Sequence, residues 1–157
     1  MTDESKNDVF FMNEAVTLAQ KAYAIGEVPI GAIVVCNEQI FGRGYNRREI
    51  DFDPLAHAEL IALKQASQHL KSWRLLDCTL YVTVEPCPMC AGALVNARVK
   101  RLVFGCKDPK AGAALSLFNI CNDARLNHRL DITPGVQEEA CANLLKDFFK
   151  ELRKCSH

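Results

Sequence analysis

Two short motifs constrain this sequence most, because the side chains they carry have to meet in space. His57 and Glu59 stand in a His-Ala-Glu triplet, and Cys87 and Cys90 follow in Pro-Cys-Pro-Met-Cys. Zinc takes thiolate sulfur and imidazole nitrogen in a tetrahedron, and cysteines three positions apart on a helical turn can reach the same ion. We therefore expect a fold that brings both motifs to one metal centre, with His57, Cys87 and Cys90 as its ligands.

The number of ligands indicates a catalytic rather than a structural metal. A structural zinc site normally has four protein ligands, whereas a catalytic site leaves one position for water. Neither motif offers a fourth ligand, and on a helix Glu59 diverges from His57 by roughly 200°. We predict that Glu59 lies beside the open position, where its carboxylate takes a proton from water and returns it to a substrate.

Each of these residues has a plainer interpretation when it is taken alone. A single helical histidine is more often a core or surface residue, and a first-turn glutamate such as Glu59 favours the helix dipole. A lone Cys-x-x-Cys also suits a redox pair. The two motifs together favour the metal. The other six cysteines are interpreted as small core residues or free thiols, namely Cys36, Cys78, Cys106, Cys121, Cys141 and Cys155.

Helical and strand patterns alternate around the two motifs. Apolar spacings of three and four, capping residues and β-branched runs locate the elements. The predicted helices cover residues 8–25, Pro54 to Leu70, Pro86 to Asn96 and Val136 to Lys154. The predicted strands cover Val28 to Cys36, Gln39 to Tyr45, Cys78 to Val84, Lys100 to Gly105 and Leu130 to Thr133. Residues 107–128 are predicted to be a loop that contains a short helix.

This order of elements predicts an α/β fold with three layers, in which a mixed five-stranded sheet is flanked by helices on both faces. We expect the first two strands to be antiparallel and the later strands to be largely parallel. In such sheets, sites form at the carboxyl ends of strands and the amino ends of the following helices. Both motifs are predicted to begin helices, so they should meet at one edge of the sheet.

The bulk properties of the chain narrow the classes of protein further. Its 157 residues, 49% of them hydrophobic, suit a single domain over residues 1–157. The formal net charge of zero argues against a protein that coats nucleic acid non-specifically. The acidic, polar start lacks a secretion signal, and no stretch of about 20 apolar residues is present. We therefore expect a cytoplasmic protein with no membrane partner.

Several further segments resemble the bacterial tRNA-specific adenosine deaminases, which belong to the cytidine deaminase-like superfamily. The similarity runs from about residue 10 to residue 153. The metal motifs are common to the whole superfamily, and the intervening segments indicate the tRNA branch. The segments that carry the resemblance are residues 27–32, 44–47, 57–59, 80–93, 103–105, 110–113, 127–129 and the pair Phe148-Phe149.

This resemblance implies hydrolytic conversion of adenosine to inosine at the wobble position of a tRNA anticodon, with release of ammonia. It implies a homodimer with one Zn²⁺ per subunit, an arginine tRNA as the typical substrate, and Glu59 as the group that protonates the ring and then the departing amine. Two alternatives stay open, because the metal motifs alone do not separate them. One is a deaminase of a free base or nucleoside such as guanine, cytosine or cytidine, and the other is a non-catalytic, zinc-stabilised RNA-binding module.

The resemblance also implies a set of substrate-binding residues. Asn46 would hydrogen-bond the base, three residues would form apolar walls, and four would contact the anticodon loop. The three wall residues are Val28, Val84 and Pro86, and the four loop contacts are Asp108, Lys110, Phe149 and Arg153. Plainer interpretations are turn residues for Asn46 and Asp108, and core filling for Phe149. A basic rim near the site, or equally a solvated face, is expected from Arg98, Lys100, Arg101, Lys107 and Lys110.

Overall fold

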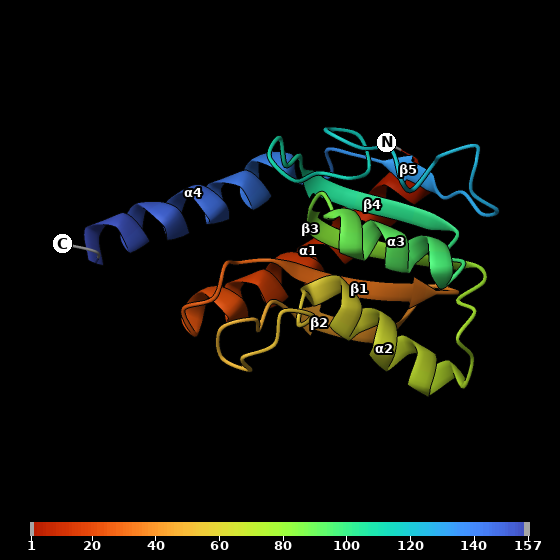
Figure 1. Ribbon diagram of the computed structural model, residues 1–157, viewed down its shortest axis with the longest axis horizontal. Helices are drawn as coiled ribbons and strands as arrows, with labels where there is room; N and C mark the ends of the chain where they lie inside the picture. Colours follow the sequence, from red (N-terminus) through yellow and green to blue (C-terminus); the bar gives the residue numbers. More distant parts are fainter. Residues whose placement is uncertain (1, 156–157) are drawn as a thin grey trace.

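One five-stranded sheet separates two layers of helices in the computed structural model, which describes residues 2–155 (Figure 1). The strands lie in the order β2-β1-β3-β4-β5. Strand β1 pairs antiparallel with both β2 and β3, whereas β3–β4 and β4–β5 are parallel pairs. The expected mixed sheet, with its first two strands antiparallel and its later strands parallel to one another, is therefore confirmed. The strands are β1 (Gly31–Cys36), β2 (Gln39–Tyr45), β3 (Cys78–Val84), β4 (Arg101–Cys106) and β5 (Asp131–Thr133).

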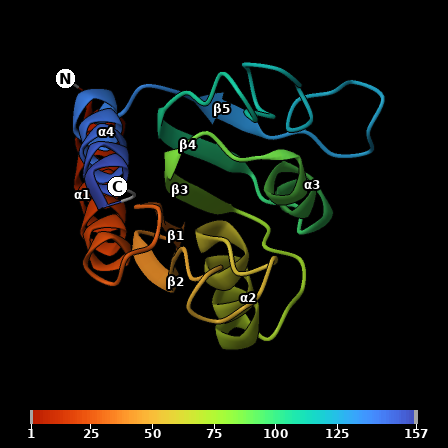
Figure 2. The ribbon, with the colours of Figure 1, turned by 60° about the vertical axis from the view of Figure 1, so that its left-hand side comes forward.

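Two helices cover each face of the sheet (Figure 2). On one face lie α1 (Asp3–Ala24) and α4 (Glu138–Cys155), and on the other lie α2 (Ala58–Leu70) and α3 (Pro88–Asn96). Successive strand residues point to opposite faces, so Ile33 joins the apolar cluster under α1 and α4 while Val34 joins the cluster under α2 and α3. Both faces of the sheet are thus buried, which completes the three-layer α/β/α architecture.

The two glycines of β2 allow α2 to lie directly on the strand. A Cβ atom on Gly42 would lie 2.1 Å from the carbonyl oxygen of Ala62, and one on Gly44 would lie 2.3 Å from that of Ala58. Any side chain at either position would push the helix away from the sheet. This close contact fixes the first turn of α2, which carries the His-Ala-Glu motif.

Element starts differ from the sequence-based expectation by three residues or more at three places, and by one or two residues in α3, α4, β4 and β5. Helix α1 begins at Asp3 rather than at residue 8, because Thr2 caps it by accepting a hydrogen bond from the Ser5 N–H at 3.1 Å. Strand β1 begins at Gly31 rather than at Val28, since the Ile30 N–H turns back to the Val28 carbonyl. The third difference, in α2, moves the helix start onto a metal-motif residue.

Helix α2 begins at Ala58, with His57 as its N-cap, and not at Pro54. The carboxylate of Asp53 accepts the Leu55 N–H at 2.9 Å, which forms a local turn instead of a helix cap. The short helix predicted within residues 107–128 is also wrong, because that segment consists of turns and irregular chain. Within residues 2–155, no helix has both the length and the apolar character that crossing a membrane requires.

Candidate active site

The amino ends of α2 and α3 meet beside the carboxyl end of β3. His57 is the N-cap of α2 and Cys87 is the N-cap of α3, each with extended backbone angles. Pro88 follows at the first position of α3, where its missing N–H has no cost, and Cys90 lies in the same first turn. The expectation that both motifs begin helices and converge is therefore confirmed.

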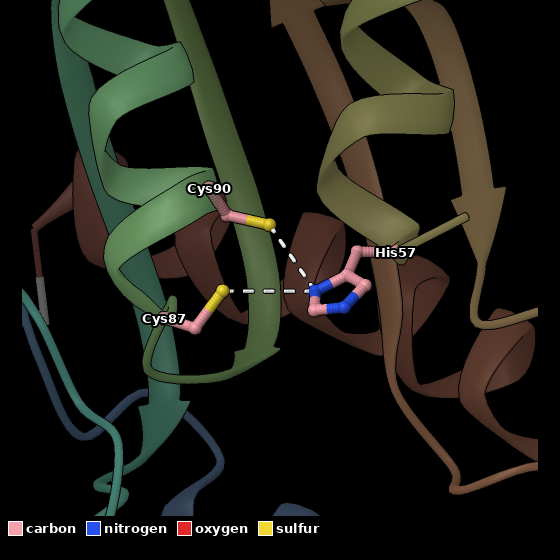
Figure 3. Close-up of side chains that lie close together, drawn as sticks. All are labelled: His57, Cys87 and Cys90. Atoms are coloured by element: carbon pink, nitrogen blue, oxygen red, sulfur yellow. Dashed lines mark hydrogen bonds between the residues drawn. The ribbon is translucent and has the colours of Figure 1, made fainter. Parts of the chain in front are cut away.

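The three predicted ligand atoms have the separations of a tetrahedral zinc site (Figure 3). Nδ1 of His57 lies 3.7 Å from Sγ of Cys87 and 3.5 Å from Sγ of Cys90, and all three atoms lie within 4.8 Å of one another. Around a zinc ion with bonds of about 2.3 Å to sulfur and about 2.0 Å to nitrogen, these ligand atoms would lie about 3.6 Å apart. Among the described residues, no further His, Cys, Asp or Glu joins this group. The donor set fits a catalytic zinc.

The charges at this corner favour a thiolate at Cys87 and a carboxyl group at Glu59 that exchanges protons, while the hydrogen bond between the two thiols raises the pKa of Cys90. Donation by the Cys90 thiol lowers the pKa of Cys87 to about 4, so Cys87 is a thiolate, the form that binds zinc. The hydrogen bond to Cys87 in turn raises the pKa of His57. The Glu59 side chain is 4% exposed, and burial raises its pKa to about 7. A carboxyl group of that pKa can both release and accept a proton near neutral pH.

A cavity of about 280 Å³ opens beside Glu59. This volume is near the lower end of the range of about 300–1,000 Å³ that is typical of small-molecule sites, so it suits one base rather than a larger ligand. Five of the predicted substrate-binding residues line it, namely Val28, Asn46, Val84, Asp108 and Phe149. His57, Glu59 and Cys87 line it as well, so two of the three predicted metal ligands and the predicted base-binding residues share one cavity.

The side chains of Asn46 and Asp108 are already held by backbone groups. The Asn46 amide donates to the Val28 carbonyl at 3.3 Å, and its oxygen accepts the Arg48 N–H at 3.2 Å. One amide hydrogen and one lone pair of Asn46 are left for a ligand. Oδ1 of Asp108 accepts the N–H groups of Lys110 and Ala111, so Asp108 also builds the turn that its plainer interpretation predicts.

Three of the predicted substrate-binding residues, Pro86, Lys110 and Arg153, do not line the cavity. The Pro86 carbonyl accepts the Ala113 N–H at 2.8 Å, while Lys110 and Arg153 are exposed. The expected basic rim is not found at the cavity, because none of its five residues lines it. Arg101 is the first residue of β4, at the end of the strand away from the cavity, and its guanidinium binds the Asp8 carboxylate at 2.6 Å.

Sequence reasoning missed two buried carboxylates beside the cavity, Glu27 and Glu85. Glu27 accepts the N–H of Glu49 at 3.0 Å, which ties down the loop after Asn46. Burial raises the pKa of Glu85, but donation by Ser116 and by nearby backbone N–H groups lowers it more, to below its usual value. Both residues stand in segments that carry the family resemblance, each directly before a proline or one residue away from one. Their place in these segments was the signal by which sequence reasoning could have found them.

A His-Cys-Cys centre beside a buried glutamate, at the strand ends of a five-stranded α/β/α sheet, is the arrangement of the cytidine deaminase-like enzymes. A family model described as MafB19-like deaminase matches residues 6–153 of this chain. The tRNA-specific adenosine deaminase of Bacillus subtilis is 48% identical over 147 residues, which cover 94% of this chain and 91% of that protein. The chain belongs to the tRNA-specific adenosine deaminase family, and it is an enzyme.

Solved structures agree with this placement. One comes from a study of A-to-I editing by tRNA:A34 deaminases at the wobble position of transfer RNA. It has a TM-score of 0.83 at 38% identity and covers 87% of this chain and 99% of that chain. A second is guanine deaminase from Bacillus subtilis, with a TM-score of 0.60 at 38% identity over 68% of this chain and 66% of that chain. The similarity to the first structure extends over more of both chains.

Proposed function

We propose that this enzyme hydrolyses adenosine to inosine at the wobble position of a tRNA anticodon and releases ammonia, with residues 1–157 acting as one domain. The observation that carries the proposal is the cavity of about 280 Å³, which is lined by Glu59 and by His57 and Cys87 of the His-Cys-Cys group. The relatives named for this reaction match nearly the whole chain. A base must be turned out of its loop to enter such a cavity, as is usual for enzymes that act on bases in nucleic acids.

The side chains around the cavity divide the work of the reaction. When bound by His57, Cys87 and Cys90, zinc supplies a Lewis acid that makes water nucleophilic near neutral pH. Glu59 takes one proton from the attacking water and delivers it to the ring. It then takes the second proton of that oxygen and delivers it to the amino group, so that the carbon–nitrogen bond breaks, ammonia leaves and the oxygen remains as the carbonyl of inosine. Asn46 orients the base with its remaining amide hydrogen and lone pair, so that carbon 6 faces the attacking water.

The residues at the mouth of the cavity contact the rest of the anticodon loop. Phe149 is 40% exposed and lines the cavity, while its ring meets Phe148 edge-on at a centroid distance of 5.4 Å. An exposed aromatic face can stack with an unpaired base. Lys110 and Arg153 lie outside the cavity, where cationic side chains suit phosphates. Val28 and Val84, which line the cavity, supply the apolar surfaces next to the base.

The enzyme is further proposed to be a cytoplasmic homodimer with one Zn²⁺ per subunit and an arginine tRNA as substrate. Large exposed apolar side chains are available for a partner surface to bury. Examples are Phe52 at 94%, Leu76 at 60% and Phe118 at 54% exposure. Light scattering on the eluting protein should give twice the mass of the 17.5 kDa chain, and a monomer at micromolar concentration would contradict the dimer.

The substrate assignment is tested by offering the zinc-loaded enzyme an anticodon stem-loop with adenosine at the wobble position, next to free adenosine, cytidine and guanine. We expect inosine in the stem-loop and little turnover of the free compounds. The structural similarity to a guanine deaminase makes a free base the second candidate. Turnover of guanine without inosine in the stem-loop would favour that candidate.

The remaining alternatives differ in metal content and in the role of Glu59. A redox pair of Cys87 and Cys90 predicts a reversible disulfide and no bound metal, which elemental analysis of the freshly purified protein decides. A non-catalytic zinc module predicts that Glu59→Gln leaves RNA processing unchanged.

A further inference from the structure

One buried carboxylate holds together an entire loop at the cavity. Glu85 is 3% exposed and directly follows β3. Its Oε2 accepts the N–H groups of Ala114 at 3.1 Å and of Leu115 and Ser116 at 2.8 Å each. Its Oε1 accepts the N–H of Asp108 at 3.1 Å and the hydroxyl of Ser116 at 2.5 Å. All of these donors belong to residues 107–118, called here the 107–118 loop.

The 107–118 loop has neither helix nor strand, and its backbone is wrapped closely around the Glu85 carboxylate. A Cβ atom on Gly112 would lie 2.4 Å from Cδ of Glu85 and 2.5 Å from the Asp108 carbonyl oxygen. A loop without regular structure must find other partners for its N–H groups, and in this loop Glu85 provides four of them. The loop therefore depends on Glu85 for its conformation, and glycine at 112 makes room for that carboxylate.

Glu85 also joins this loop to the metal ligands. Asp108 and Ala111 of the loop line the cavity, and so does Glu85 itself. Cys87 follows Glu85 by two residues, and the Ala113 N–H donates to the Pro86 carbonyl between them at 2.8 Å. Residues 85–87 therefore determine the distance between the 107–118 loop and the predicted metal ligands.

We propose that Glu85 is a positioning residue for substrate recognition, whose carboxylate holds the 107–118 loop at the distance from the metal ligands that the anticodon loop requires. The proposal rests on the proposed function for the identity of the substrate. Glu85 acts through the loop and has no part in the proton transfers. Its loss therefore weakens the binding of the stem-loop while the reaction of bound substrate continues.

The test uses Glu85→Gln, because glutamine keeps the shape of the side chain and only one of its two acceptor oxygens. If that oxygen faces residues 114–116, the amide group meets the Asp108 N–H, donor against donor. We expect the KM for the stem-loop to rise about tenfold, since hydrogen bonds to a charged group are among the stronger ones. We expect kcat to stay within about twofold and zinc content to stay unchanged, because Glu59 and the metal ligands are intact.

Two further variants keep the comparison interpretable. Ser116→Ala removes one hydrogen bond to Glu85 and leaves its charge, so it should raise KM in the same direction by about threefold. It also tests the proposal if Glu85→Gln does not fold. Glu139→Gln changes an exposed glutamate of α4 and should leave KM, kcat and zinc content at their starting values.

Hydrogen exchange measured on the zinc-loaded proteins is independent of the substrate. In Glu85→Gln, the amides of the 107–118 loop should exchange about tenfold faster, while those of α3 should not change. If the starting protein makes no inosine, the proposed function fails. Hydrogen exchange then still tests whether Glu85 holds the 107–118 loop. Unchanged exchange in the loop, an unchanged KM, or a loss confined to kcat would each overturn the role of Glu85.

Discussion

The metal corner, formed by His57, Glu59, Cys87 and Cys90, and the 107–118 loop face the same cavity but are built by different means. In the metal corner, each side chain is placed by the first turn of a helix that packs on the sheet. In the loop, the conformation depends on hydrogen bonds to one carboxylate 23 to 31 residues away in sequence. Regular elements thus fix the chemistry, while a long-range contact fixes the surface that meets the substrate.

This difference predicts that the two regions fail separately. Changes in the metal corner should abolish metal binding or the chemical step and leave substrate binding nearly intact. Changes in the loop and at the mouth of the cavity should weaken binding and leave the metal in place.

The largest effect is expected from Cys87→Ala. Two protein ligands of different type cannot hold zinc as three can, so the zinc content should fall from about one ion per chain to near zero, and activity should fall with it. Elemental analysis and the inosine assay measure the two quantities. Cys121→Ala, at a buried cysteine away from the cavity, is the matched control. Full zinc content in Cys87→Ala would contradict the ligand assignment.

Glu59→Gln should separate the metal from the proton transfers. The amide cannot act as a general acid or base, so kcat should fall by about 10²- to 10⁴-fold with zinc content and stem-loop affinity retained. Single-turnover kinetics with the stem-loop measure the chemical step directly. Activity within a few-fold of the starting enzyme would show that the proton moves through another group.

The neighbouring phenylalanines of α4 give a sharper comparison at the mouth of the cavity. Phe149 is 40% exposed and lines the cavity, whereas Phe148 is 7% exposed and packs on Tyr23 at a centroid distance of 5.6 Å. Phe149→Ala should raise the KM for the stem-loop about tenfold through lost base stacking, with little change in stability. Phe148→Ala should instead lower the free energy of unfolding by about 3–5 kcal/mol, measured with urea.

The smallest effect is expected from Lys110→Ala. Lys110 is exposed and lies outside the cavity, so a contact with a phosphate would be screened by salt. The KM should rise by less than about threefold, and the salt dependence of stem-loop binding should lose about one unit of slope. An unchanged slope would show that Lys110 does not contact the RNA backbone.

The same comparison explains what the sequence revealed in advance. The His-Cys-Cys group and the buried Glu59 beside it could be predicted because their spacing is local and each proposed chemical role restricts the residue type. The five strands were located because apolar runs mark them. The start of α2 was misplaced because Asp53 and Pro54 have the residue types of a helix start, yet the Asp53 carboxylate caps only the Leu55 N–H.

The 107–118 loop could not be predicted in the same way. Its organising group, Glu85, stands in another part of the sequence, and no local pattern links a strand-end glutamate to backbone N–H groups of residues 108–116. The sequence could not separate a basic rim from a solvated face for a related reason. Arg101 is close in sequence to Cys106, which ends β4 beside the site. Arg101 is the first residue of that strand, so it lies at the end of the sheet away from the site.

X-ray absorption at the zinc edge of the loaded enzyme tests the central claim most directly. A metal held by Cys87, Cys90 and His57 predicts two sulfur neighbours at about 2.3 Å, one imidazole nitrogen at about 2.0 Å and one further light atom that an added ligand can replace. A spectrum with four protein ligands, or a protein that binds no zinc, would contradict the account.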